Sequence, residues 1–88
     1  MKVCVFASGS GGNCLLLEGG GTNILIDAGI SMRRIASGLA QAQLTMRDIG
    51  GVLITHEHSD HISGLKMLLK HHHLPVYAPH TVLSLIHI

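Results

Sequence analysis

Metal-binding side chains are concentrated in the short stretch THEHSDH, in which His56, His58, Asp60 and His61 occupy four of six consecutive positions. His56 and His58 are two residues apart, so in an extended segment both imidazoles point to the same side and can reach one cation. Neutral imidazole is the commonest metal ligand of proteins and suits zinc well. Asp60 and His61 follow where the chain turns into a helix, and they can point to a second cation beside the first. Paired cations of this kind form two-metal hydrolytic centres.

Other chemistry fits this stretch less well. The zincin motif HExxH requires a second histidine four residues after the first, and Asp60 stands at that position. A single His–Asp acid–base pair does not account for three histidines in six residues. The apolar run GVLIT, residues 51–55, leads directly into the cluster and places it at the carboxyl end of a strand, where α/β folds build their sites. A polar loop with chance histidines is the remaining alternative.

The first third of the chain is expected to form an antiparallel meander. Residues 2–7 (KVCVFA) predict a buried strand, because the run is short, apolar and β-branched and ends at the glycine-rich SGSGGN. Residues 14–19 predict a second strand and residues 23–29 (NILIDAG) a third. Tight glycine-containing turns join the three strands.

Helices and strands alternate in the remainder. Ser31 is a plausible N-cap for a helix over residues 32–43, and Thr45 with Asp48 predicts a short capped turn. Three further elements follow, each named by its residues: a strand buried on both faces over 51–55, a helix over 62–73 that Pro75 stops, and a strand over 75–78. Pro79 could open a last helix. The expected order is β-β-β-α-β-α-β in one α/β (α+β) unit, without an internal repeat or a linker.

Composition restricts the classes of protein that fit. The 88 residues are 47% hydrophobic and only 12% charged, which suggests that some apolar surface is meant to be covered by further structure. The net charge is +1 with no basic run, so bulk electrostatics alone do not predict nucleic-acid binding. No apolar run approaches the ~18–20 residues of a membrane span and no signal peptide is apparent, so a cytoplasmic protein without membrane association is expected. Two cysteines fit buried, reduced thiols.

The pattern HxHxDH after a buried strand resembles the hallmark of the metallo-β-lactamase-fold hydrolases. The segments FASGSGGNCLLLE and TNILIDAGIS are similar to the start of a subgroup of bacterial predicted exonucleases known as YycJ or WalJ. The resemblance covers residues 1 to about 82. It implies the four-layered αββα sandwich of this family, of which this chain would supply the N-terminal half, truncated after one sheet with its helices.

The resemblance also implies roles for single residues. His56 and His58 would bind a first divalent ion, and Asp60 and His61 a second, the ions being Zn²⁺ or Mn²⁺. Asp60 would thereby take part directly in catalysis, in which a hydroxide shared by the two ions attacks the substrate. Asp27, in LIDAG, would support the metal-binding loop by a hydrogen bond to an imidazole, the alternative being that it only forms a turn at a strand end.

The expected function is therefore that of a metal-dependent hydrolase, a phosphodiesterase or exonuclease that acts on nucleic acid, DNA in particular, in its full-length form. Hydrolysis of thioesters or lactones is the alternative within the same fold. An alternative of another class is an inactive metal-binding fragment, since the family needs a further His, Asp and His later in the chain. The remaining histidines are not expected to substitute for them: His71, His72, His73, His80 and His87.

The last six residues form a separate case. Residues 83–88 (LSLIHI) correspond, when back-translated as CTG TCT CTT ATA CAC ATC, to an adapter used in transposase-based sequencing libraries. We therefore expect the native partial domain to cover residues 1–82 and residues 83–88 to be a non-native tail, with a natural helix end as the alternative.

Overall fold

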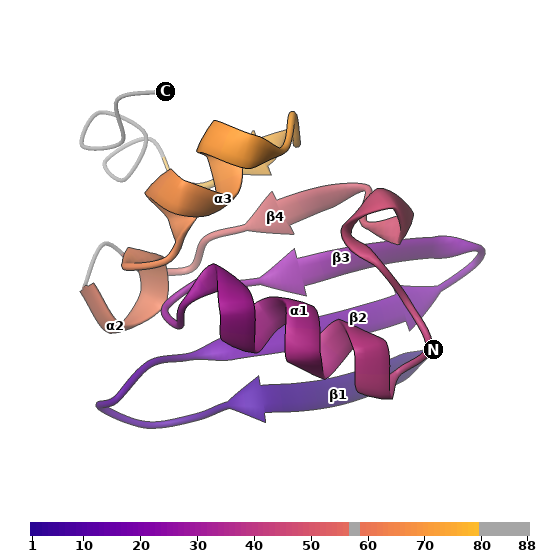
Figure 1. The fold of residues 1–88 in the computed structure, drawn as a ribbon, viewed down its shortest axis with the longest axis horizontal. Coiled ribbons are helices and arrows are strands. Elements are labelled where there is room, and N and C mark those ends of the chain that lie inside the picture. Colours follow the sequence, from indigo (N-terminus) through magenta and orange to yellow (C-terminus); the bar gives the residue numbers. More distant parts are fainter. Residues whose placement is uncertain (57–58, 80–88) are drawn as a thin grey trace.

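A five-stranded mixed sheet organises the chain, and the computed structural model describes residues 1–56 and 59–79 of it (Figure 1). The strands lie side by side in the order of the sequence. Their bounds are β1 (Lys2–Ala7), β2 (Cys14–Gly19), β3 (Thr22–Ile26), β4 (Gly51–Leu53) and β5 (Val76–Tyr77). The predicted order of the strands is confirmed, with two helices in place of the one expected between β4 and β5, and the chain has the mixed α/β content that was expected.

The direction of the strands changes in the middle of the sheet. The pairs β1–β2 and β2–β3 are antiparallel, as the meander prediction requires, whereas β3–β4 and β4–β5 are parallel. Because β3 and β4 run in the same direction, their carboxyl ends meet at one edge of the sheet (Figure 1). The prediction that the third strand continues to residue 29 is wrong: β3 ends at Ile26, since Asp27 has a left-handed backbone with φ 66° that does not fit a ladder.

Helix α1 (Met32–Gln41) follows β3 and lies across the front of β1 and β2 in Figure 1. Ser31 is its N-cap, as predicted, and its hydroxyl accepts a hydrogen bond from the backbone N–H of Arg34 at 3.2 Å. The predicted capped turn is a 3₁₀ helix, η1 (Met46–Asp48), in which the backbone N–H of Thr45 donates to the Asp48 carboxylate. Both caps can be predicted from the sequence, because each depends on a hydrogen bond between residues three positions apart.

The single helix predicted over residues 62–73 is wrong. Two helices replace it, α2 (Ser59–Ile62) and α3 (Leu65–His71), with a break between them at residues 63–64. Gly64 occupies the break because its backbone N–H donates to the carbonyl of Ala28 at 2.7 Å. A Cβ atom at this position would lie only 1.8 Å from the Ile30 carbonyl oxygen. The packing of the chain on residues 28–30 therefore interrupts a helix that sequence periodicity alone would continue.

A second glycine holds the same segment from the other side. Gly12 has φ 134°, and a Cβ atom there would lie 2.5 Å from the carbonyl oxygen of Gly29. The backbone N–H of Gly29 in turn donates to the carbonyl of Asn13 at 2.9 Å. Residues 28–30 are thus fixed between the loop after β1 and the break after α2.

The hydrophobic core lies between the sheet and the helices that cover one of its faces. Leucine and isoleucine side chains of α1 and α3 pack there against every second residue of the central strands. The largest fully buried side chains are Leu16, Leu25, Val52, Ile54, Ile35, Leu39, Leu65, Leu68 and Cys14. This face supplies the packing that holds the described part of the chain together.

The opposite face of the sheet is apolar and exposed. The strand register aligns Val5, Leu15, Ile26, Leu53 and Tyr77 in one row across all five strands. In this row Val5 is 62% exposed and Tyr77 59%. The prediction that the first strand is buried is wrong for this reason: β1 is an edge strand with one face packed and the other open. Likewise β4 is buried on one face only, because Leu53 is exposed.

Two further predictions concern the end of the chain. The helix after Pro79, the tail over residues 83–88, and both His80 and His87 lie outside the described residues. Among the residues that are described, no helix has the length and apolar character needed to cross a bilayer.

Candidate metal centre

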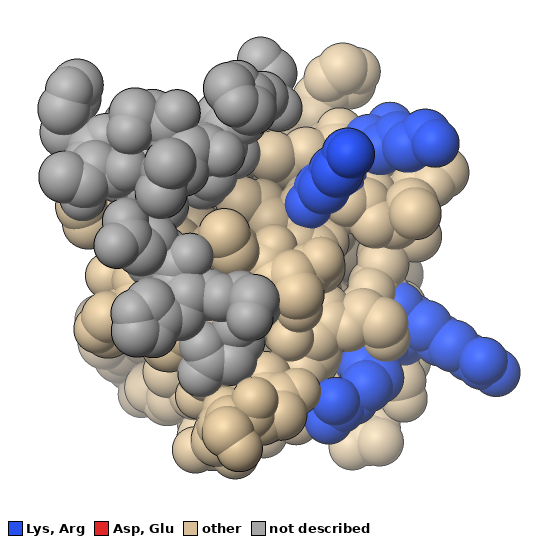
Figure 2. Space-filling view, turned by 90° about the vertical axis from the view of Figure 1, so that its left-hand side faces the viewer, with Lys and Arg blue, Asp and Glu red and all other residues tan. Residues whose placement is uncertain are grey.

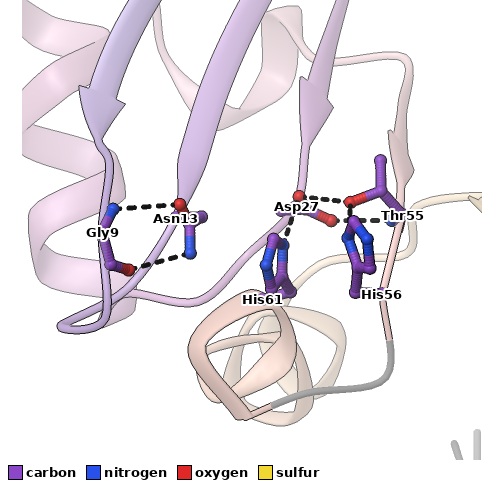
Figure 3. A network of polar contacts seen from close by, with 6 residues as sticks. All are labelled: Gly9, Asn13, Asp27, Thr55, His56 and His61. Atoms are coloured by element: carbon purple, nitrogen blue, oxygen red, sulfur yellow. Dashed lines mark hydrogen bonds and ion pairs between the residues drawn. The ribbon is translucent and has the colours of Figure 1, made fainter.

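The candidate site is assembled at the edge where β3 and β4 end. Asp27 follows β3, Thr55 and His56 follow β4, and His61 belongs to α2 (Figures 1 and 3). The backbone N–H of Asp27 donates to the carbonyl of Leu53 at 2.7 Å, so the two chain segments stay paired just beyond their strands. The sheet thereby brings together residues that are 28 and 34 positions apart.

Helix α2 is attached to the same segment through its backbone. The N–H of Ala28 donates to the carbonyl of His61 at 2.7 Å, and the hydroxyl of Ser63 donates to the carbonyl of Gly29 at 2.7 Å. These bonds fix the position of the helix that carries His61 relative to the end of β3.

Asp27 is the centre of the polar network in Figure 3. Its side chain is buried, the residue being 5% exposed, and it accepts three hydrogen bonds. Oδ1 accepts from the backbone N–H of Thr55 at 2.7 Å, and Oδ2 accepts from the Thr55 hydroxyl at 2.7 Å. The third contact joins Oδ2 to Nδ1 of His61 at 2.6 Å. These partners meet the need of a buried carboxyl group for hydrogen bonds.

The two described histidines lie side by side. Their ring centroids are 4.7 Å apart with the planes tilted by 46° (Figure 3). Nδ1 of His56 lies 2.9 Å from the hydroxyl oxygen of Thr55, and Nδ1 of His61 faces Asp27. Each ring is therefore held through the same nitrogen by a neighbouring oxygen.

The other two predicted ligands are described less completely. His58 lies outside the described residues, and Asp60 is placed only as a backbone residue of α2. Within residues 1–56 and 59–79 no group of three or more His, Cys, Asp or Glu side chains is arranged to hold a metal ion. His71, His72 and His73, at the end of α3, are therefore not part of such a group. The ligand set of His56, His58, Asp60 and His61 thus stays a prediction.

His56 and His61, the two predicted ligands whose side chains are described, make contacts that are typical of metal-binding histidines. Histidines that bind metals characteristically use their second ring nitrogen for a hydrogen bond to a carboxylate or another oxygen, which fixes the ring. His61 has this arrangement with Asp27, and His56 has it with Thr55. The donor types are those that zinc prefers.

Sequence reasoning missed two members of the site region. Thr55 contacts both oxygens of Asp27 and the ring of His56, although it stood unremarked at the end of the predicted strand. Asn13 closes the loop after β1: its side-chain oxygen accepts from the N–H of Gly9 at 3.1 Å, and its amide donates to the Gly9 carbonyl at 3.0 Å. Thr55 could have been noticed in the sequence, because its hydroxyl-bearing side chain directly precedes the first histidine of the motif.

Cys14 lies in the core near this network, and its surroundings change the acidity of its thiol. Its burial, and secondarily the negative charge of Asp27, raise the pKa of its thiol to about 12. The thiol is therefore neutral at physiological pH. A neutral, buried thiol is a poor nucleophile. The expectation that both cysteines are buried holds for Cys14, whereas Cys4 is only partly buried.

Residues 7–86 match the metallo-beta-lactamase superfamily, and the chain belongs to this family. Among characterised proteins it is similar to exodeoxyribonuclease YycJ of Bacillus anthracis, with 47% identity over 74 residues. It is also similar to exodeoxyribonuclease WalJ of Streptococcus pneumoniae serotype 2 (strain D39 / NCTC 7466), with 43% identity over 77 residues, and to ribonuclease Z of Methanopyrus kandleri, with 39% identity over 71 residues.

These alignments cover most of this chain but a small part of each relative. They include 84%, 88% and 74% of this chain and 28%, 29% and 24% of the three relatives, respectively. The chain thus spans less than a third of the length of the curated relatives that it matches. The resemblance seen in the sequence, to the superfamily and to its YycJ or WalJ subgroup, is confirmed.

Proposed function

We propose that this chain provides part of the active site of a metal-dependent hydrolase that cleaves phosphodiester bonds of nucleic acid, DNA in particular. The observation that carries the proposal is the Asp27–Thr55–His56–His61 network, which fixes two imidazoles side by side at the carboxyl end of two parallel strands. The relatives named exodeoxyribonuclease support the choice of substrate.

Four residues would hold the metal. His56 and His58 would bind a first divalent ion, Zn²⁺ or Mn²⁺, and Asp60 and His61 a second. When bound, such ions polarise the phosphoryl oxygen and lower the pKa of the attacking water. Asp27 orients the ring of His61 by accepting from its Nδ1, and the Thr55 contact orients His56. Asp60 would be the residue of this set that acts closest to the reacting atoms.

The face of the molecule at this end carries basic side chains. Figure 2 views the molecule from the end at which β3 and β4 terminate. Lysine and arginine side chains stand along one side of this face, and no Asp or Glu of the described residues shows on it. Positive side chains beside a site raise the local concentration of phosphate-bearing ligands.

The 88-residue polypeptide taken alone is proposed to bind metal without turnover. A catalytic zinc ion typically takes about three protein ligands, so two ions need more than the four candidates between residues 56 and 61. Metal stoichiometry of the 88-residue chain, together with its hydrolysis of bis(p-nitrophenyl) phosphate, tests this. Two tightly bound ions with turnover would contradict it.

The hydrolase proposal is tested in the polypeptide extended to the length of its relatives. His58→Ala should lower the rate of hydrolysis of end-labelled single-stranded DNA by several orders of magnitude, because one metal ligand is lost. His73→Ala, an exposed histidine outside the motif, is the matched control and should retain the rate. Full activity of His58→Ala would contradict the metal mechanism. Preferential hydrolysis of a thioester or lactone over DNA would favour the alternative substrate class.

A further inference from the structure

The hydroxyl of Thr55 lies between the two parts of the polar network. Its oxygen is 2.7 Å from Oδ2 of Asp27 and 2.9 Å from Nδ1 of His56 (Figure 3). The backbone N–H of the same residue donates to Oδ1 of Asp27 at 2.7 Å. Thr55 therefore contacts both oxygens of the buried carboxylate and the ring of the first candidate ligand, although it is not itself a candidate ligand.

The number of protons decides the direction of these hydrogen bonds. A threonine hydroxyl carries one proton and an ionised carboxylate can only accept, so the Thr55 proton points to Asp27. The hydroxyl oxygen can then serve His56 only as an acceptor. If the proton pointed to His56 instead, lone pairs of the Thr55 and Asp27 oxygens would face each other at 2.7 Å in a partly buried contact, which is unfavourable. Nδ1 of His56 must consequently carry a proton.

The same reasoning applies to the second imidazole. Nδ1 of His61 lies 2.6 Å from Oδ2 of Asp27 and donates its proton to that oxygen. In a neutral imidazole the lone pair is then on Nε2, the nitrogen through which the ring would coordinate a cation. Both rings are thus in the same tautomer, and one carboxylate sets both, directly for His61 and through Thr55 for His56.

We propose that Thr55 is a positioning residue: its hydroxyl, oriented by Asp27, fixes His56 as the Nδ1–H tautomer and so presents Nε2 of this ring to a divalent cation. The part that concerns the cation rests on the proposed function, whereas the tautomer does not. The role is exerted through His56, and no contact of Thr55 with substrate is involved.

The tautomer can be measured without any metal. Two-bond ¹H–¹⁵N spectra of the metal-free 88-residue chain, labelled at histidine and recorded at a pH where the imidazoles are neutral, distinguish protonated from unprotonated ring nitrogens. We expect protonated Nδ1 and unprotonated Nε2 for both His56 and His61. A His56 signal with the proton on Nε2 would overturn the proposal in the wild-type chain, whatever any variant does.

Two variants separate the hydroxyl from the rest of the side chain. Thr55→Val replaces the hydroxyl by a methyl group and keeps the backbone bond to Asp27, while Thr55→Ser keeps both the hydroxyl and this bond. We expect the valine variant to show a mixture of His56 tautomers with His61 unchanged, and to bind Zn²⁺ about 10–100-fold more weakly. Serine should restore both readouts. A folded valine variant with wild-type tautomer and Zn²⁺ affinity would contradict the proposal.

Thr45→Val is the matched control. It removes another threonine hydroxyl that lies 3.3 Å from a carboxylate oxygen, that of Asp48, outside the site. We expect no change in tautomer or Zn²⁺ affinity. A wild-type chain that shows the expected tautomers but binds no Zn²⁺ would contradict the proposed metal site and leave the assignment of the tautomer to Thr55 in place. The two failures are therefore distinguishable.

Discussion

The two faces of the sheet differ although neighbouring residues of the same strands form them. Leu16 and Leu17 are adjacent in β2 and have the same side chain, but Leu16 is fully buried beneath the helices whereas Leu17 is only partly buried. Side chains alternate between the two faces of a strand, so every strand contributes to both. The covered face thus forms a core, and the open face is an apolar surface with Val3 and Val5 more than half exposed.

This difference shows which part of the fold supports the site. The segment 28–30 is held by Gly12 and by Gly64, and the network at Asp27 lies next to it. The site therefore depends on the helix-covered side, on which α2 and α3 pack. In the αββα sandwich of the family a second sheet packs face to face on the first. The open face has the apolar character that such a contact requires.

Replacing Gly64 should break the covered side most severely. In Gly64→Ala the new Cβ would overlap the Ile30 carbonyl oxygen, so the break between α2 and α3 could not approach residues 28–30. We expect a loss of more than about 4 kcal/mol in the free energy of unfolding, and with it the ordered network at Asp27. Urea denaturation followed by circular dichroism measures it. Gly11→Ala, at which a Cβ atom meets nothing within 4 Å, should be nearly neutral.

The leucine pair of β2 compares the two faces directly. Leu16→Ala removes a fully buried side chain and should cost about 2–5 kcal/mol of unfolding free energy, whereas Leu17→Ala should cost well under half of that. Both variants are measured by chemical denaturation under the same conditions. Equal losses would mean that the open face is already covered in solution.

The dependence of stability on pH tests whether Cys14 is buried on the covered face. Its pKa is raised from the ordinary 9.0 to about 12 in the folded chain, so the unfolded chain ionises first as pH rises. The stability linked to this thiol is therefore fully present below pH 9 and is lost progressively between about pH 9 and 12. The denaturation midpoint of the wild type should fall more steeply over this range than that of Cys14→Ala. Parallel curves would contradict the raised pKa.

Charges on the open face should have the smallest effect on stability. We expect the double variant Val3→Lys, Val5→Lys to change the free energy of unfolding by no more than about 0.5 kcal/mol per site, because both side chains point to solvent. It should reduce the binding of a hydrophobic dye such as 8-anilinonaphthalene-1-sulfonate and any self-association seen by analytical ultracentrifugation. Unchanged dye binding would place the exposed apolar surface elsewhere.

Local sequence signals predicted much of the fold. The meander, the N-cap Ser31 and the capped turn at Thr45 depend on neighbours only a few residues apart, so they were readable in the chain. The predictions failed where distant segments meet. The helix over 62–73 is divided because Gly64 packs on residues 28–30, and the third strand ends early because Asp27 turns into the site.

The sequence by itself determined the types and spacing of the candidate ligands, the order of the strands, and the alternation that creates two apolar faces. The tertiary structure decided which of those faces is covered, and it brought Asp27 to Thr55 and His61. Those contacts join residues 28 and 34 positions apart, and they exist because β3 and β4 pair in parallel and end at the same edge. Hydrogen bonds of this range depend on strand pairing, which no local pattern around Asp27 contains.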